Sequence, residues 1–399
     1  MRIASKRATL AILLLILATL TYAYASPTLV EATAKPIPSN LPWYPLIFFG
    51  DNRPMNYLSD NPPDVFYTAL HEINALYPVA VIGLGDHVGY GYESQYKKFY
   101  EIMTSTRLEN QWYIMGNHEV VYPDGWTYWQ QYIGPLYMIR DDIPGWRLAL
   151  LNTEVGVDQW QQMLDKTYTG LDGRRLILAF HRPAYPDVNH NLKPEHSAVL
   201  HAYMNRYGWP PLAVQAHWHG WAYYKLNGTE WLIAGSTGAP LYPTSDCQGG
   251  ATCVSDYHYL VAILYPNGTY WYAPVSATRG TLNITAPNST AYLVANRKLD
   301  VYGKPVPLPV RLRFKVGETT LYVVVLAPAN KTTVVNINQR LNNRLETNAT
   351  AFYAYYTKQN PQTATVITAS SGLALAAYGL TGTPQTSVED LRTPTPPPP

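Results

Sequence analysis

Cysteine and charged residues are scarce in this chain. Its 399 residues include two cysteines, and charged side chains make up only 14% of the total. The formal net charge is +2, so the sequence offers no general electrostatic attraction for nucleic acid or for an anionic membrane. We therefore expect no specific nucleic-acid recognition, and any anionic ligand must be held by a few local groups.

The two cysteines, Cys247 and Cys253, bracket a short loop. In an oxidising compartment such a close pair favours a disulfide. The alternative is a thiolate pair on a soft metal, but no second pair of cysteines is present to complete a tetrahedral site.

A long apolar run occurs at the N-terminus, where a basic leader precedes residues Ala8 to Leu20. Ala23-Tyr24-Ala25 then forms a small-x-small cleavage signature. This arrangement predicts a signal peptide over residues 1–25 and a secreted or cell-surface, extracytoplasmic protein. The alternative is a retained membrane anchor, although the run is shorter than the ~20 residues that a span needs. We expect no transmembrane span in the mature chain.

Six Asn-x-Ser/Thr sequons fit an exported glycoprotein. They begin at Asn227, Asn267, Asn283, Asn288, Asn330 and Asn348. Chance competes with this interpretation because the chain is rich in threonine. Asn227-Gly228 and Asn267-Gly268 also lie between apolar-rich runs, where Asn-Gly favours a two-residue hairpin turn.

Short apolar runs alternate with helical patterns from residue 40 to about residue 280. The predicted buried strands are Leu46 to Phe49, Val79 to Leu84, Trp112 to Met115, Leu148 to Leu151, Leu176 to Phe180 and Leu212 to Val214. The predicted helices are Asp64 to Leu76, Glu93 to Thr104, Asp158 to Lys166 and Glu195 to Tyr207. Alternating strands and helices indicate an α/β domain over residues 40–280.

The pattern changes after about residue 280. Residues Val310 to Val316 alternate strictly between apolar and basic side chains, which predicts a strand with one face in water. We expect a small all-β, sandwich-like domain over residues 281–380 and a Pro-rich, extended tail over residues 381–399. Appended sandwiches often serve adhesion or packing, so this region is a candidate for cell-surface association.

Polar motifs follow five of the predicted strands. They are Gly50-Asp51-Asn52-Arg53, Gly85-Asp86, Gly116-Asn117-His118-Glu119, His181-Arg182-Pro183 and His217-Trp218-His219. Ligands of α/β domains gather at the carboxyl ends of strands, where separate loops aim side chains into one pocket. Carboxylates, an amide oxygen and imidazoles together suit a dinuclear metal centre.

The order of these motifs resembles the calcineurin-like metallophosphoesterase family, which includes the purple acid phosphatases. The resemblance covers roughly residues 44 to 275 and is most specific at Gly116-Asn117-His118-Glu119 and His217-Trp218-His219. It implies a four-layer αββα sandwich of two facing sheets covered by helices. It also implies hydrolysis of phosphate mono- or diesters, in which a metal-bound hydroxide attacks phosphorus at a dinuclear centre of manganese, iron or zinc ions.

The resemblance implies six metal ligands: Asp51, Asp86, Asn117, His181, His217 and His219. Asp86 would bridge both ions. Asn117, His181 and His217 would complete one site, and Asp51 and His219 would belong to the other.

The site that contains Asp51 departs from the family pattern. Many relatives have a histidine two residues after the first aspartate, where this chain has Arg53. Purple acid phosphatases instead have a tyrosine three residues after the bridging aspartate. This chain has Gly89 at that position, with Tyr90 one residue later. We therefore expect this first site to bind its ion weakly, to remain empty, or to take a ligand such as His87 or His258. Arg53 offers a planar fork of donors for a substrate phosphate; the alternative is an arginine paired with a nearby carboxylate.

The resemblance gives His118 a catalytic role rather than a metal-binding one. We expect its ring near the leaving group, where it donates a proton or a hydrogen bond, with Glu119 orienting the ring.

Two other functions compete with a phosphoesterase. The incomplete first site favours a catalytically impaired extracellular or surface-layer binding protein on the same scaffold. The same metal chemistry could also hydrolyse another bond, such as a sulfate ester or an amide.

Overall fold

A computed structural model describes residues 26–288, 291–316, 319–338, 344–347, 351–357, 367–370, 375–376 and 386–387. The predicted signal peptide and all but two residues of the predicted Pro-rich tail lie outside these ranges. In the part of the chain that is described, no helix is both long enough and apolar enough to cross a bilayer.

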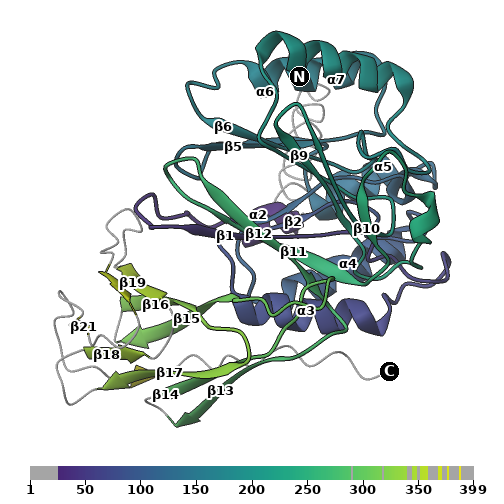
Figure 1. Cartoon of the computed structure of the whole chain (residues 1–399). Coiled ribbons are helices and arrows are strands. Elements are labelled where there is room, and N and C mark those ends of the chain that lie inside the picture. The colour runs from purple at the N-terminus through teal and green to yellow at the C-terminus, as the bar shows by residue number, and fades with distance from the viewer. Residues whose placement is uncertain are drawn as a thin grey trace, which may run out of the picture.

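Two β-sheets form the centre of the molecule (Figure 1). The first has the order β12 (Tyr270–Ser276), β11 (His258–Leu264), β1 (Tyr44–Phe49), β2 (Ala80–Gly83) and β3 (Gln111–Tyr113). The second has the order β10 (Thr252–Val254), β8 (Gly220–Leu226), β9 (Thr229–Gly235), β7 (Leu212–Gln215), β6 (Arg175–Phe180), β5 (Trp146–Leu151) and β4 (Met138–Arg140). Within them β1, β2 and β3 run parallel, as do β5, β6, β7 and β9.

Strand β1 shows how the sequence builds the layers. All six of its residues are buried because successive side chains point to opposite faces of the sheet and both faces are covered. Leu46 and Phe48 belong to the apolar core between the two sheets. Ile47 and Phe49 belong instead to the core beneath the helices on the other face.

Helices cover the outer face of each sheet. Those over the first sheet are α2 (Leu29–Thr33), α3 (Asp64–Leu76) and α4 (Glu93–Thr104), and α5 (Gly125–Tyr128) follows nearby; those over the second are α6 (Val157–Tyr168) and α7 (Pro194–Tyr207). In α6 the buried residues Trp160, Met163, Leu164 and Thr167 recur every three or four positions, so one face packs on the sheet. The four predicted helices are thus confirmed, as is the predicted αββα sandwich.

Residues after Thr281 form two smaller antiparallel sheets. One has the order β13 (Leu282–Asn288), β14 (Ala291–Asn296), β17 (Lys331–Asn338), β18 (Arg344–Thr347) and β21 (Leu375–Ala376). The other has the order β20 (Ile367–Ser370), β19 (Ala351–Thr357), β16 (Thr319–Leu326), β15 (Pro309–Val316) and β22 (Thr386–Ser387). These sheets agree with the all-β class predicted for this part of the chain.

Arg311, on the basic face predicted for β15, is not in water. Arg311 is only 3% exposed, donates to the carboxylate of Glu109 at 3.2 Å, and lies over the rings of Tyr77 and Tyr322. The prediction of a wetted face was wrong because an alternating pattern does not distinguish water from a polar surface of the neighbouring layer. The basic face therefore docks the strand onto the α/β sheets.

Of the two predicted two-residue Asn-Gly turns, the one at Asn227-Gly228 forms, whereas Asn267-Gly268 lies in a longer loop over residues 265–269. Asn227 and Gly228 both have positive φ, 50° and 81°, and join β8 to β9. Gly268, with φ 83°, lies in the turn between β11 and β12.

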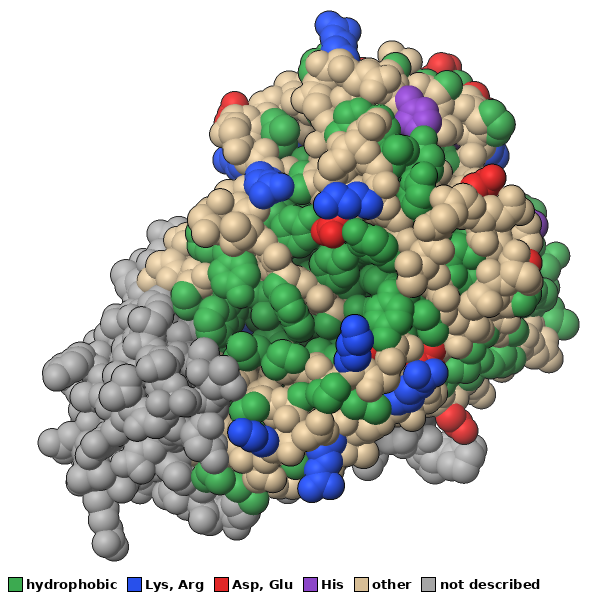
Figure 2. All heavy atoms as spheres, in the orientation of Figure 1, with side chains coloured by type: hydrophobic (Ala, Val, Ile, Leu, Met, Phe, Trp, Pro, Cys, Tyr) green, Lys and Arg blue, Asp and Glu red, His purple; other side chains and the backbone are tan. Residues whose placement is uncertain are grey.

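A surface cleft of about 530 Å³ lies at the edges of the two central sheets. Its lining includes Trp221, Tyr223, Trp271, Tyr272 and Tyr302. Figure 2 shows hydrophobic side chains gathered in a hollow on this face of the molecule. The cleft differs in composition from the carboxylate- and histidine-lined centre at the strand ends.

Candidate metal centre

Five of the candidate ligands lie just beyond the carboxyl ends of parallel strands. Asp51 follows β1, Asp86 follows β2, Asn117 comes after β3, His181 follows β6 and His217 comes shortly after β7. Parallel strands of one sheet end at the same edge, and the ligands that follow the strands of the two sheets meet in common groups.

Three candidate ligands adopt a left-handed backbone conformation that non-glycine residues rarely take. The φ angles are 47° at Asp51, 54° at Asp86 and 67° at His217. Such strain persists where the surrounding structure holds it, and it clusters at functional sites.

The structure brings five of the six predicted ligands into two groups. Asp86, His181 and His217 form one, and Asp51, Asp86 and His219 form the other. Within each group the potential ligand atoms lie within 4.8 Å of one another, and every member is buried. Asp86 belongs to both groups, which is the arrangement that the resemblance implies for a bridging carboxylate.

The predicted sixth ligand, Asn117, lies at the first of these groups. Its Oδ1 is 3.2 Å from Nε2 of His181. The same Nε2 lies 3.3 Å from Oδ1 of Asp86 and 3.0 Å from Nδ1 of His217. Nδ1 of His181 donates to the carbonyl of Leu84 at 2.8 Å, so in the neutral ring Nε2 carries a lone pair. A lone pair and two acceptor oxygens that converge in this way fit a cation between them.

The second group contains carboxylate oxygens without hydrogen bonds. Oδ2 of Asp51 accepts from the backbone N–H of His217 at 2.9 Å, while its Oδ1 lies 3.5 Å from Nε2 of His219. Oδ1 of Asp51 and Oδ2 of Asp86 are buried and have no hydrogen-bond partner. Nδ1 of His219 donates to the carbonyl of Pro240 at 2.7 Å, which leaves Nε2 free to bind a metal. Buried, unpartnered carboxylate oxygens are costly unless a cation compensates them, so this group also fits a metal.

Glycines allow the backbone to approach these ligands closely. A Cβ atom at Gly116 would collide with the Asp86 carboxylate, and one at Gly235 would collide with that of Asp51. Larger side chains at either glycine would displace a ligand.

The electrostatics of the centre favour the metal-binding forms of Asp86 and His217; for His181, burial opposes the charge, but Asp86, Asp51 and Glu154 raise its pKa. Burial opposes the charge of Asp86, but His181, His118 and His217 together hold the pKa of this carboxyl below its ordinary value. Burial, helped by His181, lowers the pKa of His217 well below that of free histidine. An ionised carboxylate and a neutral imidazole are the forms that bind cations.

His118 lies beside the groups rather than in them. Its Nδ1 donates to the carbonyl of Gly89 at 2.6 Å, and its Nε2 is 3.9 Å from Oδ2 of Asp86. The expected orientation of the ring by Glu119 is therefore wrong. The Glu119 carboxylate instead accepts from the backbone N–H groups of residues 86, 87 and 116, at 3.0, 2.6 and 2.7 Å. Burial, together with the nearby Asp86, raises the pKa of Glu119.

Arg53 is buried near the mouth of the centre. The side chain is 3% exposed, its Nη1 donates to the carbonyl of Pro54 at 3.2 Å, and its guanidinium lies 4.6 Å from the centre of the Tyr57 ring. Nε has no hydrogen-bond partner. Across the described residues no carboxylate forms an ion pair with Arg53, so the alternative of a simple carboxylate partner is not supported.

Neither histidine considered as a substitute ligand joins the two groups. Nδ1 of His87 contacts Oδ1 of Asn52 at 2.7 Å, its Nε2 accepts from the N–H of Gly85 at 3.3 Å, and burial lowers its pKa to about 3. Nδ1 of His258 donates to the carbonyl of Asp256 at 3.0 Å. Both are buried structural histidines.

Two residues near His217 were not predicted to be functional. Nη1 of Arg182 lies 3.3 Å from Nε2 of His217, and Glu154 holds the guanidinium through a 2.8 Å ion pair. The ring of His190 lies 5.7 Å from that of His217 and is exposed. Arg182 directly follows a predicted ligand, which could have signalled its position; His190 lies in a loop with no comparable motif.

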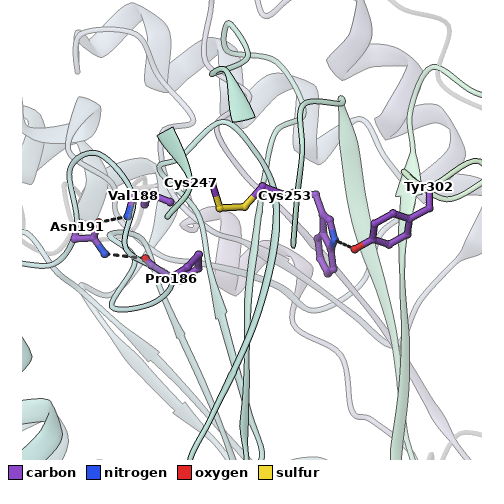
Figure 3. The surroundings of a disulfide bond; sticks show 7 residues. Pro186, Val188, Asn191, Cys247, Cys253 and Tyr302 are labelled. Atoms are coloured by element: carbon purple, nitrogen blue, oxygen red, sulfur yellow. Dashed lines mark hydrogen bonds between the residues drawn. A yellow bond between two sulfur atoms is a disulfide. The ribbon is translucent and has the colours of Figure 1, made fainter. Parts of the chain in front are cut away.

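The predicted disulfide is present and supports the loop that carries His190. Cys247 and Cys253 are bonded, and both pack against a small apolar cluster that includes Val188 (Figure 3). The N–H of Gln248 donates to the carbonyl of Asp187 at 3.0 Å. Figure 3 also shows Asn191 hydrogen-bonded to Pro186 and Val188, which closes the loop on itself.

No protein-family model matches the chain, and no curated protein matches it in sequence. Solved structures do match it. GAP50, described as the anchor in the inner membrane complex of Plasmodium, is 11% identical over 60% of this chain and 87% of its own, with a TM-score of 0.47. A purple acid phosphatase from yellow lupin (Lupinus luteus) is 16% identical over 67% of this chain and 53% of its own, with a TM-score of 0.48. A candidate 5′-nucleotidase from Staphylococcus aureus is 9% identical over 58% and 53%, with a TM-score of 0.36.

The matching structures include a phosphatase, a nucleotidase and a predicted phosphoesterase, as the sequence resemblance to the calcineurin-like metallophosphoesterase family leads one to expect. This chain spans about half the length of the phosphatase and of the nucleotidase. At such low identities and TM-scores the likeness carries no argument about activity. Function has to be inferred from the residues of the centre itself.

Proposed function

We propose that this chain is an extracytoplasmic, metal-dependent phosphoesterase that hydrolyses phosphate mono- or diesters at a dinuclear centre. The observation that carries the proposal is the pair of buried ligand groups that share Asp86. Manganese, iron and zinc all suit carboxylate, amide and imidazole ligands. Asp51 and His219 would hold one ion with Asp86, and Asn117, His181 and His217 the other.

Two such cations would bind phosphate oxygens, lower the pKa of a water between them and stabilise charge during in-line displacement. The chain's own residues would then position the ester. His118 is suited to the leaving-group side because Gly89 fixes its Nδ1 and leaves Nε2 facing the centre. A protonated Nε2 can donate to a departing oxygen.

Arg53 is suited to hold a phosphate oxygen. Its guanidinium is buried and retains a donor, Nε, without a partner. A planar guanidinium binds phosphate through paired, charge-assisted hydrogen bonds. The positive charge of Arg53 would also replace part of the charge that is missing if the site of Asp51 and His219 binds its ion weakly.

The test is hydrolysis of an aryl phosphate monoester and of its diester by the mature chain. The protein is first stripped of metal with a chelator and then given manganese, zinc or iron. We expect activity to disappear on stripping and to return with at least one metal. The relative rates with the two esters give the substrate class. Sulfate esters in the same assay test the alternative that the chain hydrolyses a bond other than a phosphate ester.

A binding protein on the same scaffold remains the second candidate. The observation in its favour is that the group of Asp51, Asp86 and His219 offers three carboxylate or histidine ligands, with Arg53 where many relatives have a fourth. A chain that hydrolyses no ester with any metal, yet binds metal, would favour this function.

The expected processing and domain division belong to the same proposal. Cleavage of residues 1–25, glycosylation at the sequons and a division into residues 40–280, 281–380 and 381–399 fit an exported enzyme with an appended surface-associating region. N-terminal sequencing of the protein recovered outside the cells tests the first of these: a chain that still begins at Met1 would contradict cleavage.

A further inference from the structure

Large hydrophobic side chains are exposed at one place beside the metal centre. The six that are most exposed in the described part of the chain are Met55 (47%), Tyr57 (48%), Leu58 (65%), Val121 (43%), Tyr207 (49%) and Tyr302 (43%). Four of these lie in two segments that flank His118: residues 55–58, whose Tyr57 ring is 5.0 Å from the His118 ring, and Val121, three residues after His118 in the chain. The other two, Tyr207 and Tyr302, lie on other elements, so the four near His118 mark an interaction site.

These loops are held in place by buried hydrogen bonds. Gln95 is 2% exposed; its Nε2 donates to the carbonyls of Tyr57 and Ser59 at 2.7 and 2.9 Å, and its Oε1 accepts from the N–H of Tyr90 at 2.8 Å. The N–H of Tyr122 donates to the carbonyl of Tyr90 at 3.0 Å. The buried Gln95 side chain therefore joins the loop of residues 54–60 to the loop of residues 89–92. The second loop is joined by a backbone hydrogen bond to residue 122.

Aromatic rings connect this surface to the reacting groups. The Tyr57 ring lies 5.0 Å from the ring of His118 and 4.6 Å from the guanidinium of Arg53. The rings of Tyr90, Tyr92 and Tyr122 follow one another at 5.0 and 5.1 Å. We call the surface of Met55, Tyr57, Leu58 and Val121 the apolar platform.

We propose that the apolar platform binds the alcohol part of the substrate, and that this part is aromatic or otherwise apolar. The inference rests on the proposed phosphoesterase function. A phosphate held at the centre directs its leaving group toward His118, and the next surface beyond that ring is Tyr57. An apolar group there is removed from water together with the platform's own side chains, which stabilises the complex.

The experiment compares two monoesters, 1-naphthyl phosphate and glycerol 2-phosphate, with the metal-loaded full mature chain. The variant is Leu58→Ser with Val121→Ser, since both side chains are exposed and their loss creates no cavity. We expect the ratio of kcat/KM for the naphthyl ester to that for the glycerol ester to fall about fivefold or more, within the range that apolar contacts provide in enzyme specificity. Tyr207→Ser, an equally exposed hydrophobic residue at the end of α7, should leave the ratio unchanged.

An unchanged ratio in the double variant would overturn the inference while leaving the proposed function intact. A second outcome would also overturn the inference: the wild type binds neutral phosphatidylcholine vesicles, and the double variant loses that binding but keeps the ratio of kcat/KM values. The apolar platform would then face a membrane. A wild-type chain that hydrolyses neither ester with any metal would overturn the proposed function itself, and this inference with it. Thermal unfolding of both variants checks that they fold.

Discussion

Nζ of Lys298 lies 2.8 Å from Oε1 of Glu72, and the pair is buried between α3 and the segment that follows β14. The hydroxyl of Tyr259 donates to the other carboxylate oxygen at 3.0 Å. One carboxylate therefore links α3, strand β11 and the C-terminal part of the chain. Burial nevertheless raises the pKa of Glu72, against the opposing effect of Lys298.

Lys298→Met should destabilise the protein because it leaves the Glu72 carboxylate buried without its cation. Removing one partner of a buried pair costs about 3 kcal/mol or more. A carboxyl with a raised pKa is penalised above that pKa and relieved below it, so the loss should shrink as the pH falls. The free energy of unfolding in guanidinium chloride at pH 8 and pH 5 measures both effects.

Adding Glu72→Gln to Lys298→Met removes the unpaired charge and should restore part of the lost stability. A loss that is equal at both pH values, or a double variant less stable than Lys298→Met, would contradict the assignment of this pair.

His181→Ala and His219→Ala should each remove metal from a different site. Each histidine belongs to one ligand group only, whereas Asp86 belongs to both. We therefore expect Asp86→Ala to lose all bound metal and each histidine variant to lose part of it. Elemental analysis after dialysis provides the count, with His71→Ala, an exposed histidine on α3, as the control. Equal metal content in all four proteins would exclude a metal centre here.

His118→Asn should lower turnover without loss of metal. The backbone N–H of residue 118, which donates to Oδ1 of Asp86 at 3.0 Å, is retained in the variant. Loss of a proton donor typically lowers turnover about 10²-fold or more. Steady-state kinetics and elemental analysis on one preparation separate the two properties. Metal loss in this variant would instead make His118 a ligand.

Arg53→Ala should raise KM for a phosphate ester about tenfold, the amount that one charge-assisted hydrogen bond contributes. Arg53→Lys keeps the charge but loses the planar fork, so its KM should lie between those of the wild type and the alanine variant. Metal content should remain the same in both. If neither KM nor turnover changes in Arg53→Ala, the substrate role is wrong.

The sequence predicts those parts of the centre that depend on the order of residues within a short segment. Asp51, Asn117 and His181 each follow an apolar run that forms a parallel strand, and such strands share an edge, so their meeting could be expected. The role of Glu119 could not, because its bonds run to backbone groups of another loop, which leave no mark in side-chain patterns. The burial of Arg311 was missed for a similar reason, since only the packing of two layers decides which face meets water.

Glu119 also ties together parts of the centre that the ligands alone would leave independent. The loops after β2 and β3 supply the shared carboxylate and the amide oxygen, and both donate backbone N–H groups to this one side chain. Glu119 therefore fixes their relative position, and a metal bound at the proposed centre would meet ligands that need little rearrangement. A replacement in either loop that disturbs the common anchor should alter the spacing between the two ions, even when every ligand is kept.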